Sequence, residues 1–597
     1  MVNVKDHQTE WLFDPWNHLG PRRRKLLERS WSGVFRKYLL EKLPVGEIAK
    51  HFDEIMGRPT KELYTAMGAL ILQQLHDLSD PEVTMALAFH ENWHYALDIT
   101  DDSDASTYIS ERTLRRYRKI LIKEGLDRVL FETLTDTLIE TFGVDTSKQR
   151  LDSTYIRSNM RIMGRIGIFA STIRKFLKKL KRSHGTLYTA LALSELKDRY
   201  LTKNSDNLFS QVKPSEATKT LQGVANDLLY LIEFYRSHDT VRRLPEYKLL
   251  ERVLDECCTV TGSGKDATVE LKPPKDIPPY SLQNPSDPEA GYDAHKGSGY
   301  QAQVMETYQD EKQDDKKPDL ITHVEVEPAH IHDSHALLPA IDATSKRDCH
   351  PEELVCDSHY GSDDNVLQAE AKDVEIIAPI QGNAPMNDIT LSDFEIDQLT
   401  HFVIRCPESH VPEHVCRTRK NRLQARFTKK ICSTCSRLEN CPVQIGKKAS
   451  YLRYDDRRLR LAQRRAIEQT KEFKDRYRWR AGIEATISHL KSDVGAARLR
   501  VRGIDSVRFA VILKALGLNI LRCAKALDNR LCDYLFPVRR LLSTFLIRII
   551  TLYAILLSKN RYCFDFVRYT FGRSIRNVRK KICFIIMLFS HSNSRVP

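Results

Sequence analysis

Four strand-like runs between residues 300 and 380 constrain the fold of this chain more than any other feature. The runs are Tyr300–Tyr308, Leu320–Val326, Glu353–Asp357 and Val374–Ile380. A helix-sized segment, Ser334–Ser345, separates the second run from the third. Strands joined by both tight and helical connections indicate a mixed α/β sheet.

Helical patterns fill most of the chain before residue 145. An apolar stripe at helical spacing consists of Leu63, Met67, Leu70, Ile71 and Leu75. Ser110 is placed to cap a later helix, whose basic residues are Arg112, Arg115, Arg116, Arg118 and Lys119. Short helices ending in such a basic helix suit a compact DNA-binding unit, although a plain helical bundle would look alike.

The charge balance favours a polyanionic partner. The net charge is +14 and the sequence pI is about 9.0. Nucleic acid is the first candidate and an anionic membrane the second, while a basic but otherwise ordinary enzyme is the alternative.

Two aspartates stand where strands are expected to end, Asp152 in LDST and Asp357 in VCDSHYGS. Ligand-binding side chains emerge where the strands of an α/β sheet end, although an isolated aspartate there is more often a turn or cap residue. Glu484 adds a third carboxylate from a helix. Three converging carboxylates repel one another unless they hold cations, and oxygen ligands suit Mg²⁺ or Mn²⁺. Two such ions support phosphodiester chemistry.

The stretch Tyr477–Lys491 predicts one helix with two unlike sides. At about 100° per residue, one narrow stripe carries Tyr477, Arg480, Glu484 and Lys491. The apolar stripe beside it carries Trp479, Ile483, Ile487, Leu490 and Val494. On spacing alone, a surface helix with i,i+4 ion pairs explains the polar stripe as well.

These residues together resemble a bacterial insertion-sequence transposase of the DDE class. The polar stripe matches, at every spacing, the Tyr-x2-Arg-x3-Glu-x6-Lys pattern of one branch of that family. Asp152 and Asp357 sit where the family places its first two metal-binding carboxylates. The segment from about His51 to Leu121 resembles the helical N-terminal domain of the same transposases.

The resemblance implies an enzyme that binds the terminal inverted repeats of its element, cleaves them and joins them to target DNA. Its catalytic and metal-binding residues would be Asp152, Asp357 and Glu484, holding two Mg²⁺ or Mn²⁺ ions. Its DNA-binding residues would be Tyr477, Arg480 and Lys491. A homodimer in the active complex, and a place in the bacterial cytoplasm at the nucleoid, follow from the family.

The expected fold class is α/β, with an RNase H-like mixed-sheet catalytic core. An all-α N-terminal DNA-binding domain precedes the core at residues 1–145. Residues 146–160, 290–400 and 465–525 form the core. It is interrupted by a helical insertion and linker at 161–289 and by a Cys-rich zinc-binding insertion at 401–464. Residues 526–597 form a C-terminal tail of unknown role.

Four cysteines are candidates for a structural Zn²⁺ site. Cys432 and Cys435 have knuckle spacing, Cys441 follows closely, and Cys406 precedes them. A reduced structural cluster is the alternative reading. The fourth ligand stays open, because Cys416, His410 or His414 could replace Cys406. Similar transposases carry such a run between the second aspartate and the glutamate.

Several other side chains near the predicted site have a simpler explanation. His323, His330, His332 and His335 fit a loop with incidental histidines better than a metal site. Asp333 could face the active site from a neighbouring strand end, and His359 could support the metal ligands from outside. Trp479 could stack on an unpaired base, but it falls on the apolar stripe.

The ends of the chain bear on location and on rival functions. The N-terminus lacks the basic start and apolar core of a signal peptide, which predicts a reducing cytosol. Leu541–Leu557 is membrane-like but short, and a central arginine favours a buried helix instead. One rival is a non-catalytic, zinc-stabilised DNA-binding protein derived from a transposase, because the sequence is irregular after about Asp528. The other is an RNase H-like nuclease that does not join strands.

Overall fold

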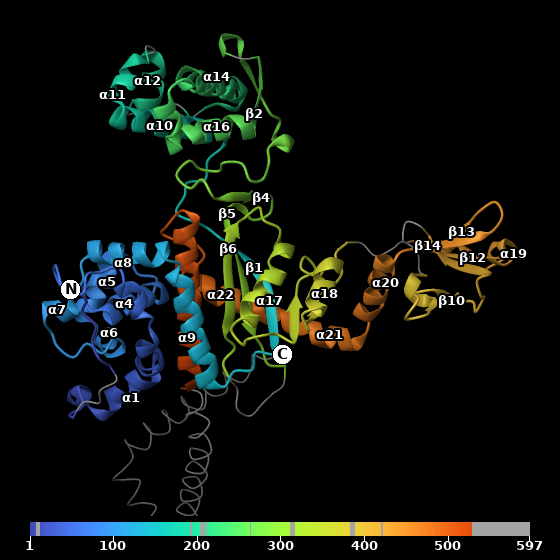
Figure 1. The fold of residues 1–597 in the computed structure, drawn as a ribbon, viewed down its shortest axis with the longest axis horizontal. Helices are drawn as coiled ribbons and strands as arrows, with labels where there is room; N and C mark the ends of the chain where they lie inside the picture. Colours follow the sequence, from blue (N-terminus) through green and yellow to red (C-terminus); the bar gives the residue numbers. More distant parts are fainter. Residues whose placement is uncertain are drawn as a thin grey trace, which may run out of the picture. The chain divides into compact units, whose positions relative to one another are not determined.

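The computed structural model describes residues 1–7, 12–191, 194–202, 209, 212–262, 264–310, 317–382, 389–418 and 422–527, with elements labelled in Figure 1. The predicted tail beyond residue 527, including the membrane-like segment Leu541–Leu557, lies outside the described residues. Within those ranges, no helix has both the length and the apolar character needed to cross a membrane.

Short helices build the N-terminal region, as the sequence predicts. The helices are α1 (Pro21–Arg29), α2 (Trp31–Val34), α3 (Val45–Ala49), α4 (Leu63–Leu75), α5 (Asp80–Phe89), α6 (Glu91–Ala96), α7 (Asp104–Thr107), α8 (Glu111–Lys123) and α9 (Leu126–Phe142). The predicted apolar stripe of α4 is buried. The Ser110 hydroxyl caps α8 by accepting a hydrogen bond from the Thr113 amide at 3.2 Å.

A mixed sheet confirms the α/β prediction (Figure 1). Its strands are β1 (Lys148–Ile156), β4 (Gly291–Asp293), β5 (Gly297–Thr307), β6 (Ile321–Pro328), β7 (Glu353–Cys356) and β8 (Glu375–Ile377). The order is β4–β5–β1–β7–β8, with β6 also paired to β5. β5 runs antiparallel to β1, β4 and β6, whereas β7 and β8 run parallel to β1.

Helices connect and cover the parallel side of this sheet. They are α17 (Leu337–Ser345), after a short 3-10 turn at Asp333–His335, and α18 (Asp363–Glu370). Leu337, Ala340 and Ile341 of α17 pack into a core with Leu151 of β1 and Leu354 of β7. The predicted helix at 334–345 is therefore confirmed, apart from its first turn.

A separate apolar core lies within residues 165–282. It is built from α10 (Arg165–Ser183), α11 (Gly185–Ala190), α12 (Ser194–Leu201), α14 (Ala217–Tyr235), α15 (Asp239–Arg242), α16 (Pro245–Cys257) and the hairpin β2 (Cys258–Thr261) and β3 (Thr268–Leu271). The Pro- and Gly-rich stretch 262–299 is not one continuous loop, because β3 and β4 pair there with β2 and β5.

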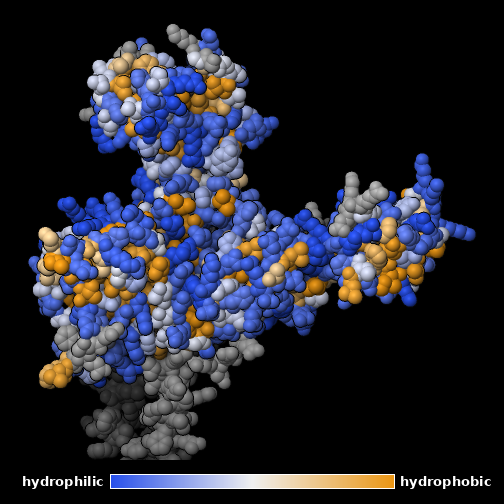
Figure 2. Space-filling view, viewed as in Figure 1, coloured by the Kyte–Doolittle hydropathy of each residue, from blue (hydrophilic) through white to orange (hydrophobic). Residues whose placement is uncertain are grey.

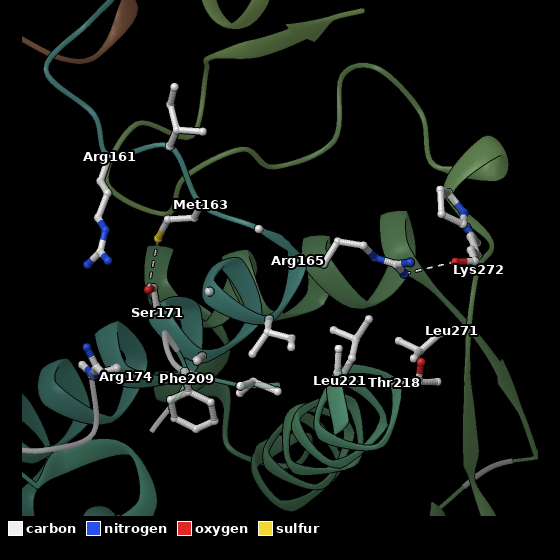
Figure 3. A pocket seen from close by; sticks show the side chains of 18 of the residues that line it. Arg161, Met163, Arg165, Ser171, Arg174, Phe209, Thr218, Leu221, Leu271 and Lys272 are labelled. Atoms are coloured by element: carbon white, nitrogen blue, oxygen red, sulfur yellow. Dashed lines mark hydrogen bonds between the residues drawn. The ribbon is translucent and has the colours of Figure 1, made fainter. Parts of the chain in front are cut away.

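The helices of this region border an open cavity, shown in Figure 3. Among the described residues that line it, every charged one is basic: Arg161, Arg165, Arg174 and Lys272. Arg165 donates to the Lys272 carbonyl at 3.1 Å. Hydrophilic residues also predominate on the face of the molecule in Figure 2.

The Cys-rich segment and the residues directly before it, from 389, contain a core and small sheets of their own. The strands are β9 (Glu395–Ile396), β10 (Val403–Arg405), β11 (His414–Arg417), β12 (Leu423–Phe427), β13 (Gln444–Ile445) and β14 (Ser450–Tyr454), with α19 (Lys429–Ser433) between β12 and β13. β11, β12, β14 and β13 form one antiparallel sheet in that order. Leu423, Ala425, Phe427 and Leu452 supply much of its core.

The chain then returns to helix. α20 (Asp456–Glu468) and α21 (Lys471–Tyr477) precede a 3-10 turn at Arg478–Ala481, and α22 (Gly482–Ser492) follows directly. A last described helix spans residues 504–527. The stretch predicted as one helix from Tyr477 is therefore divided, and a tighter 3-10 turn separates Tyr477 from Glu484.

A buried carboxylate joins these helices to the sheet. Glu306 of β5 is fully buried and pairs across the sheet with Arg150 of β1, whose Nε donates to its carboxylate at 2.7 Å. Thr486 of α22 donates to Glu306 at 2.5 Å, and Arg522 of the last helix donates at 2.8 Å. Arg150 also donates to the Trp479 carbonyl at 2.9 Å. One acidic side chain therefore fixes two strands and two helices.

We expect Glu306→Ala to lower the free energy of unfolding by about 3–5 kcal/mol, because it takes away the nearest carboxylate partner of the buried Arg150. Urea unfolding followed by circular dichroism measures the effect. Glu325→Ala is the matched control, since Glu325 of β6 forms a partly exposed pair with Arg128, and such pairs are worth about 1 kcal/mol or less. Equal losses in the two variants would contradict a special role for Glu306.

Candidate active site

The strand register places Asp152 and Asp357 side by side. Leu151 of β1 pairs with Cys356 of the parallel strand β7, so the next residue on each strand is an aspartate. β7 ends at Cys356, one residue before the predicted strand end at Asp357. The prediction that a strand ends on Asp152 is wrong, because β1 continues to Ile156 by pairing with β5 on its other edge.

The helical turn at Arg478–Ala481 and α22 bring the third carboxylate to this point. Ile483 and Leu490 are fully buried, as the apolar stripe predicts. Gly482 allows the close approach, because a Cβ at this position would lie 1.9 Å from Nη1 of Arg150. The sheet and α22 therefore meet where Arg480 and Glu484 project.

One guanidinium group contacts all three predicted carboxylates. Nη2 of Arg480 lies 2.9 Å from Asp152 Oδ2 and 3.7 Å from Asp357 Oδ2, and its Nη1 lies 3.5 Å from Glu484 Oε1. The Asp152 side chain is 14% exposed, whereas that of Glu484 is 68% exposed. The three acids thus converge on one positive charge. Arg480, predicted to bind DNA, lies among the carboxylates in this structure.

The two aspartates have opposite pKa shifts. Burial raises the pKa of Asp152 above its usual range, with further raising by Asp357 and Asp333, and Arg480 only partly opposes it. Burial also acts to raise the pKa of Asp357, but a hydrogen bond from Ser358 and the charge of Arg480 outweigh it and lower that pKa. Asp152 therefore binds a proton more readily than Asp357 does.

A second group of polar side chains lies beside Asp152. Lys296 Nζ lies 3.1 Å from the Ser153 hydroxyl and 3.5 Å from Asp333 Oδ2. Asp333 also accepts a hydrogen bond from Gln303 at 3.0 Å and lies 4.0 Å from His359 Nδ1. Asp333 therefore faces the site, as the sequence allowed. Sequence reasoning missed Lys296, because no motif marks a lysine in a turn between two strands.

Three other side chains singled out in the sequence, those of Tyr477, Trp479 and His323, are partly or fully buried. Tyr477 is partly buried and stacks on Phe473 with ring centroids 5.7 Å apart. Burial raises its pKa, which the nearby carboxylates of Asp357 and Asp152 raise further. Trp479 stacks on Tyr308 at 6.3 Å and packs in the same apolar cluster. His323 is buried within β6, so the histidine segment does not form one surface group.

Among the described residues, no group of three or more His, Cys, Asp or Glu side chains is arranged so that it could hold a metal ion. The carboxylates nevertheless fit Mg²⁺ or Mn²⁺ in kind, since all donors are oxygen atoms and a cationic side chain already occupies the space between them. Ion binding at this point would require Arg480 to move away.

The four cysteines chosen from the sequence line one small cavity: Cys406, Cys432, Cys435 and Cys441. Burial raises the pKa of the Cys432 and Cys441 thiols, and neighbouring thiols add to both shifts. His410 also lines the cavity, whereas Cys416 and His414 lie on β11 and are not among its lining residues.

Residues 405–524 match the family model described as "Transposase DDE domain". The match confirms the resemblance to a DDE-class transposase. It spans the Cys-rich segment, Arg480, Glu484 and Lys491, and leaves Asp152 and Asp357 outside. No curated protein matches the chain.

A transposase structure also aligns with this chain. It is described as the piggyBac transposase synaptic complex with hairpin DNA, and the alignment covers 84% of this chain and 78% of that chain, at 8% identity and a TM-score of 0.28.

The opposite pKa shifts predict opposite stability effects at the two aspartates. Folding raises the pKa of Asp152. The folded protein therefore loses stability as the pH rises from about 3.9, the pKa of an unfolded aspartate, through the higher pKa of Asp152 in the folded protein. We therefore expect Asp152→Asn to gain stability relative to the unaltered chain between pH 4.5 and pH 7.5. Folding lowers the pKa of Asp357, so Asp357→Asn should be less stable than the unaltered chain at pH 4.5 and at pH 7.5. Urea unfolding at each pH measures both, and shifts of the same sign would contradict the assignment.

Proposed function

We propose that this protein is a DNA transposase that binds the terminal inverted repeats of an insertion sequence and catalyses strand cleavage and strand transfer. The observation that carries the proposal is the convergence of Asp152, Asp357 and Glu484 on one guanidinium. The mixed sheet supports an RNase H-like core, since the two aspartates project next to each other from its central parallel strands. The spacing of Tyr477, Arg480, Glu484 and Lys491 matches the pattern of the same family.

The chain's own residues have separate tasks in this proposal. Asp152, Asp357 and Glu484 would hold two Mg²⁺ or Mn²⁺ ions, which supply activation of the attacking hydroxyl and stabilisation of the leaving oxygen in phosphoryl transfer. Arg480 would exchange its carboxylate partners for a DNA phosphate, since a guanidinium binds either anion in the same forked geometry. Tyr477 and Lys491 would contact the DNA backbone on either side of Arg480.

DNA is the proposed partner for charge reasons as well. The net charge is +14, and exposed cations of α8, such as Arg112 and Lys119, lie outward from its buried residues Leu114, Tyr117 and Leu121. Residues 1–145 are therefore proposed to bind the terminal repeats. Joining two element ends would need a homodimer in the active complex, and the bacterial cytoplasm at the nucleoid is the matching place.

The function is tested with a labelled element-end duplex, a plasmid target and Mg²⁺. We expect joined products from the unaltered chain, and from Asp357→Asn only the background seen without a divalent cation. Asp364→Asn is the matched control, because Asp364 is exposed on α18 and contacts none of the three carboxylates. Cleavage without joining would identify a nuclease. DNA retardation that Asp357→Asn leaves unchanged, with no cleavage by either chain, would identify a non-catalytic DNA-binding protein.

We also propose that Cys406, Cys432, Cys435 and Cys441 hold a structural Zn²⁺. The support is their shared cavity and two tight turns, in which the Ser409 amide donates to the Cys406 carbonyl at 2.8 Å and the Cys435 amide to the Cys432 carbonyl at 3.3 Å. Tetrahedral thiolate coordination would complete a small fold whose apolar core is limited.

The expected zinc content is one ion per chain, and Cys435→Ser should lose it together with the folded Cys-rich segment. Elemental analysis after dialysis measures the ion, and limited proteolysis measures the fold. Cys416→Ser should keep the zinc, because Cys416 lies on β11 away from the cavity lining. Unchanged zinc in Cys435→Ser would refute the assignment.

A further inference from the structure

Lys296 is held rigidly at the edge of the candidate active site. It lies in the turn between β4 and β5, where Asp293 Oδ1 accepts hydrogen bonds from the amides of His295 at 2.8 Å and Lys296 at 2.7 Å. The next residue, Gly297, has φ +92°, a value that favours glycine. The turn therefore fixes where the Lys296 side chain begins.

Its ammonium group reaches the residue next to Asp152. Nζ donates to Gln301 at 2.8 Å and to the Ser153 hydroxyl at 3.1 Å, and it lies 3.5 Å from Asp333. The side chain remains 28% exposed. Lys296 is therefore accessible to a ligand that approaches Asp152, and it is not a fully buried structural cation.

A second ammonium group, that of Lys491, lies near enough to Lys296 to feel its charge. Lys491 of α22 is partly buried, and among the described residues its side chain has no hydrogen-bond or ion-pair partner. Burial lowers the pKa of Lys491, and the charge of Lys296 lowers it further. The two ammonium groups repel each other. An anion bound between them would relieve that repulsion.

We propose that Lys296 is a DNA-binding residue of the active site, which together with Lys491 holds a backbone phosphate next to the scissile phosphodiester. This inference rests on the proposed function and names a further contact within it. Asp333, Gln301 and Ser153 position the Lys296 ammonium, and the longest of these contacts, to Asp333, is the one that a phosphate oxygen would replace. The phosphate would then join three cations, Arg480, Lys296 and Lys491, around the carboxylates.

A purely structural role makes a different prediction. If Lys296 serves only to neutralise Asp333, its loss would leave the Asp333 carboxylate without its cation and would disturb the site. Removing that carboxylate as well would then restore DNA binding. If Lys296 binds phosphate, removing Asp333 cannot restore the lost contact with DNA. The double variant Lys296→Met/Asp333→Asn therefore separates the two roles.

The experiment measures binding of a fluorescent terminal-repeat duplex by anisotropy, in buffer without added Mg²⁺ or Mn²⁺ and without chelator, over a series of salt concentrations. For Lys296→Met we expect weaker binding and a plot of log affinity against log salt that is shallower by about 0.9, the contribution of one phosphate contact. Lys491→Met should behave alike. The double variant with Asp333→Asn should keep the shallower slope. Thermal unfolding of each variant checks that it is folded.

Lys346→Met is the matched control, since Lys346 is an exposed lysine at the C-terminal end of α17, and its loss removes the same charge. Its slope should remain that of the unaltered chain. An unchanged slope in Lys296→Met, or a slope restored by Asp333→Asn, would overturn the inference. Because the assay contains no added Mg²⁺ or Mn²⁺ and scores no cleavage, absent strand joining would refute the proposed function without altering this result. No binding by the unaltered chain would overturn both.

Discussion

The buried Glu306 carboxylate is the interaction on which the candidate site depends. It accepts hydrogen bonds from Arg150 of β1, Thr486 of α22 and Arg522 of the last described helix. A fully buried carboxylate is tolerated only when several donors surround it, so these elements must arrive together. The same arginine donates to the Trp479 carbonyl, directly before Arg480. The network therefore sets how far the helical segment stands from the sheet.

Electrostatics at the site follow from that placement. Three carboxylates gathered at one point would repel one another in water-poor surroundings, and the Arg480 guanidinium compensates for part of that repulsion. The compensation is unequal, because Asp152 is more deeply buried than Glu484. Charging Asp152 is therefore unfavourable in this site, whereas charging Asp357 is favourable. That property suits a place where divalent cations and a phosphate are expected to bind.

The insertions fold around cores of their own. Residues 165–282 bury aromatic and aliphatic side chains between helices, and the Cys-rich segment buries others between short strands. Each therefore has an apolar core separate from that of the mixed sheet. The chemistry is instead concentrated on β1, the end of β7 and α22, although these elements lie more than a hundred residues apart in the sequence.

The sequence alone determined the element types, the acids and the α22 pattern. Period-two and helical spacing revealed the strands from β5 to β8 and the buried stripe at Ile483 and Leu490, since local burial imposes those periods. It did not reveal the length of β1, the break at Arg478–Ala481 or the place of Lys296. The length of β1 depends on pairing with β5, and the helix break on the close contact of Gly482 with Arg150. The place of Lys296 depends on a turn that carries no motif. Only the tertiary structure decides them, because each arises from residues distant in sequence whose packing no local pattern records.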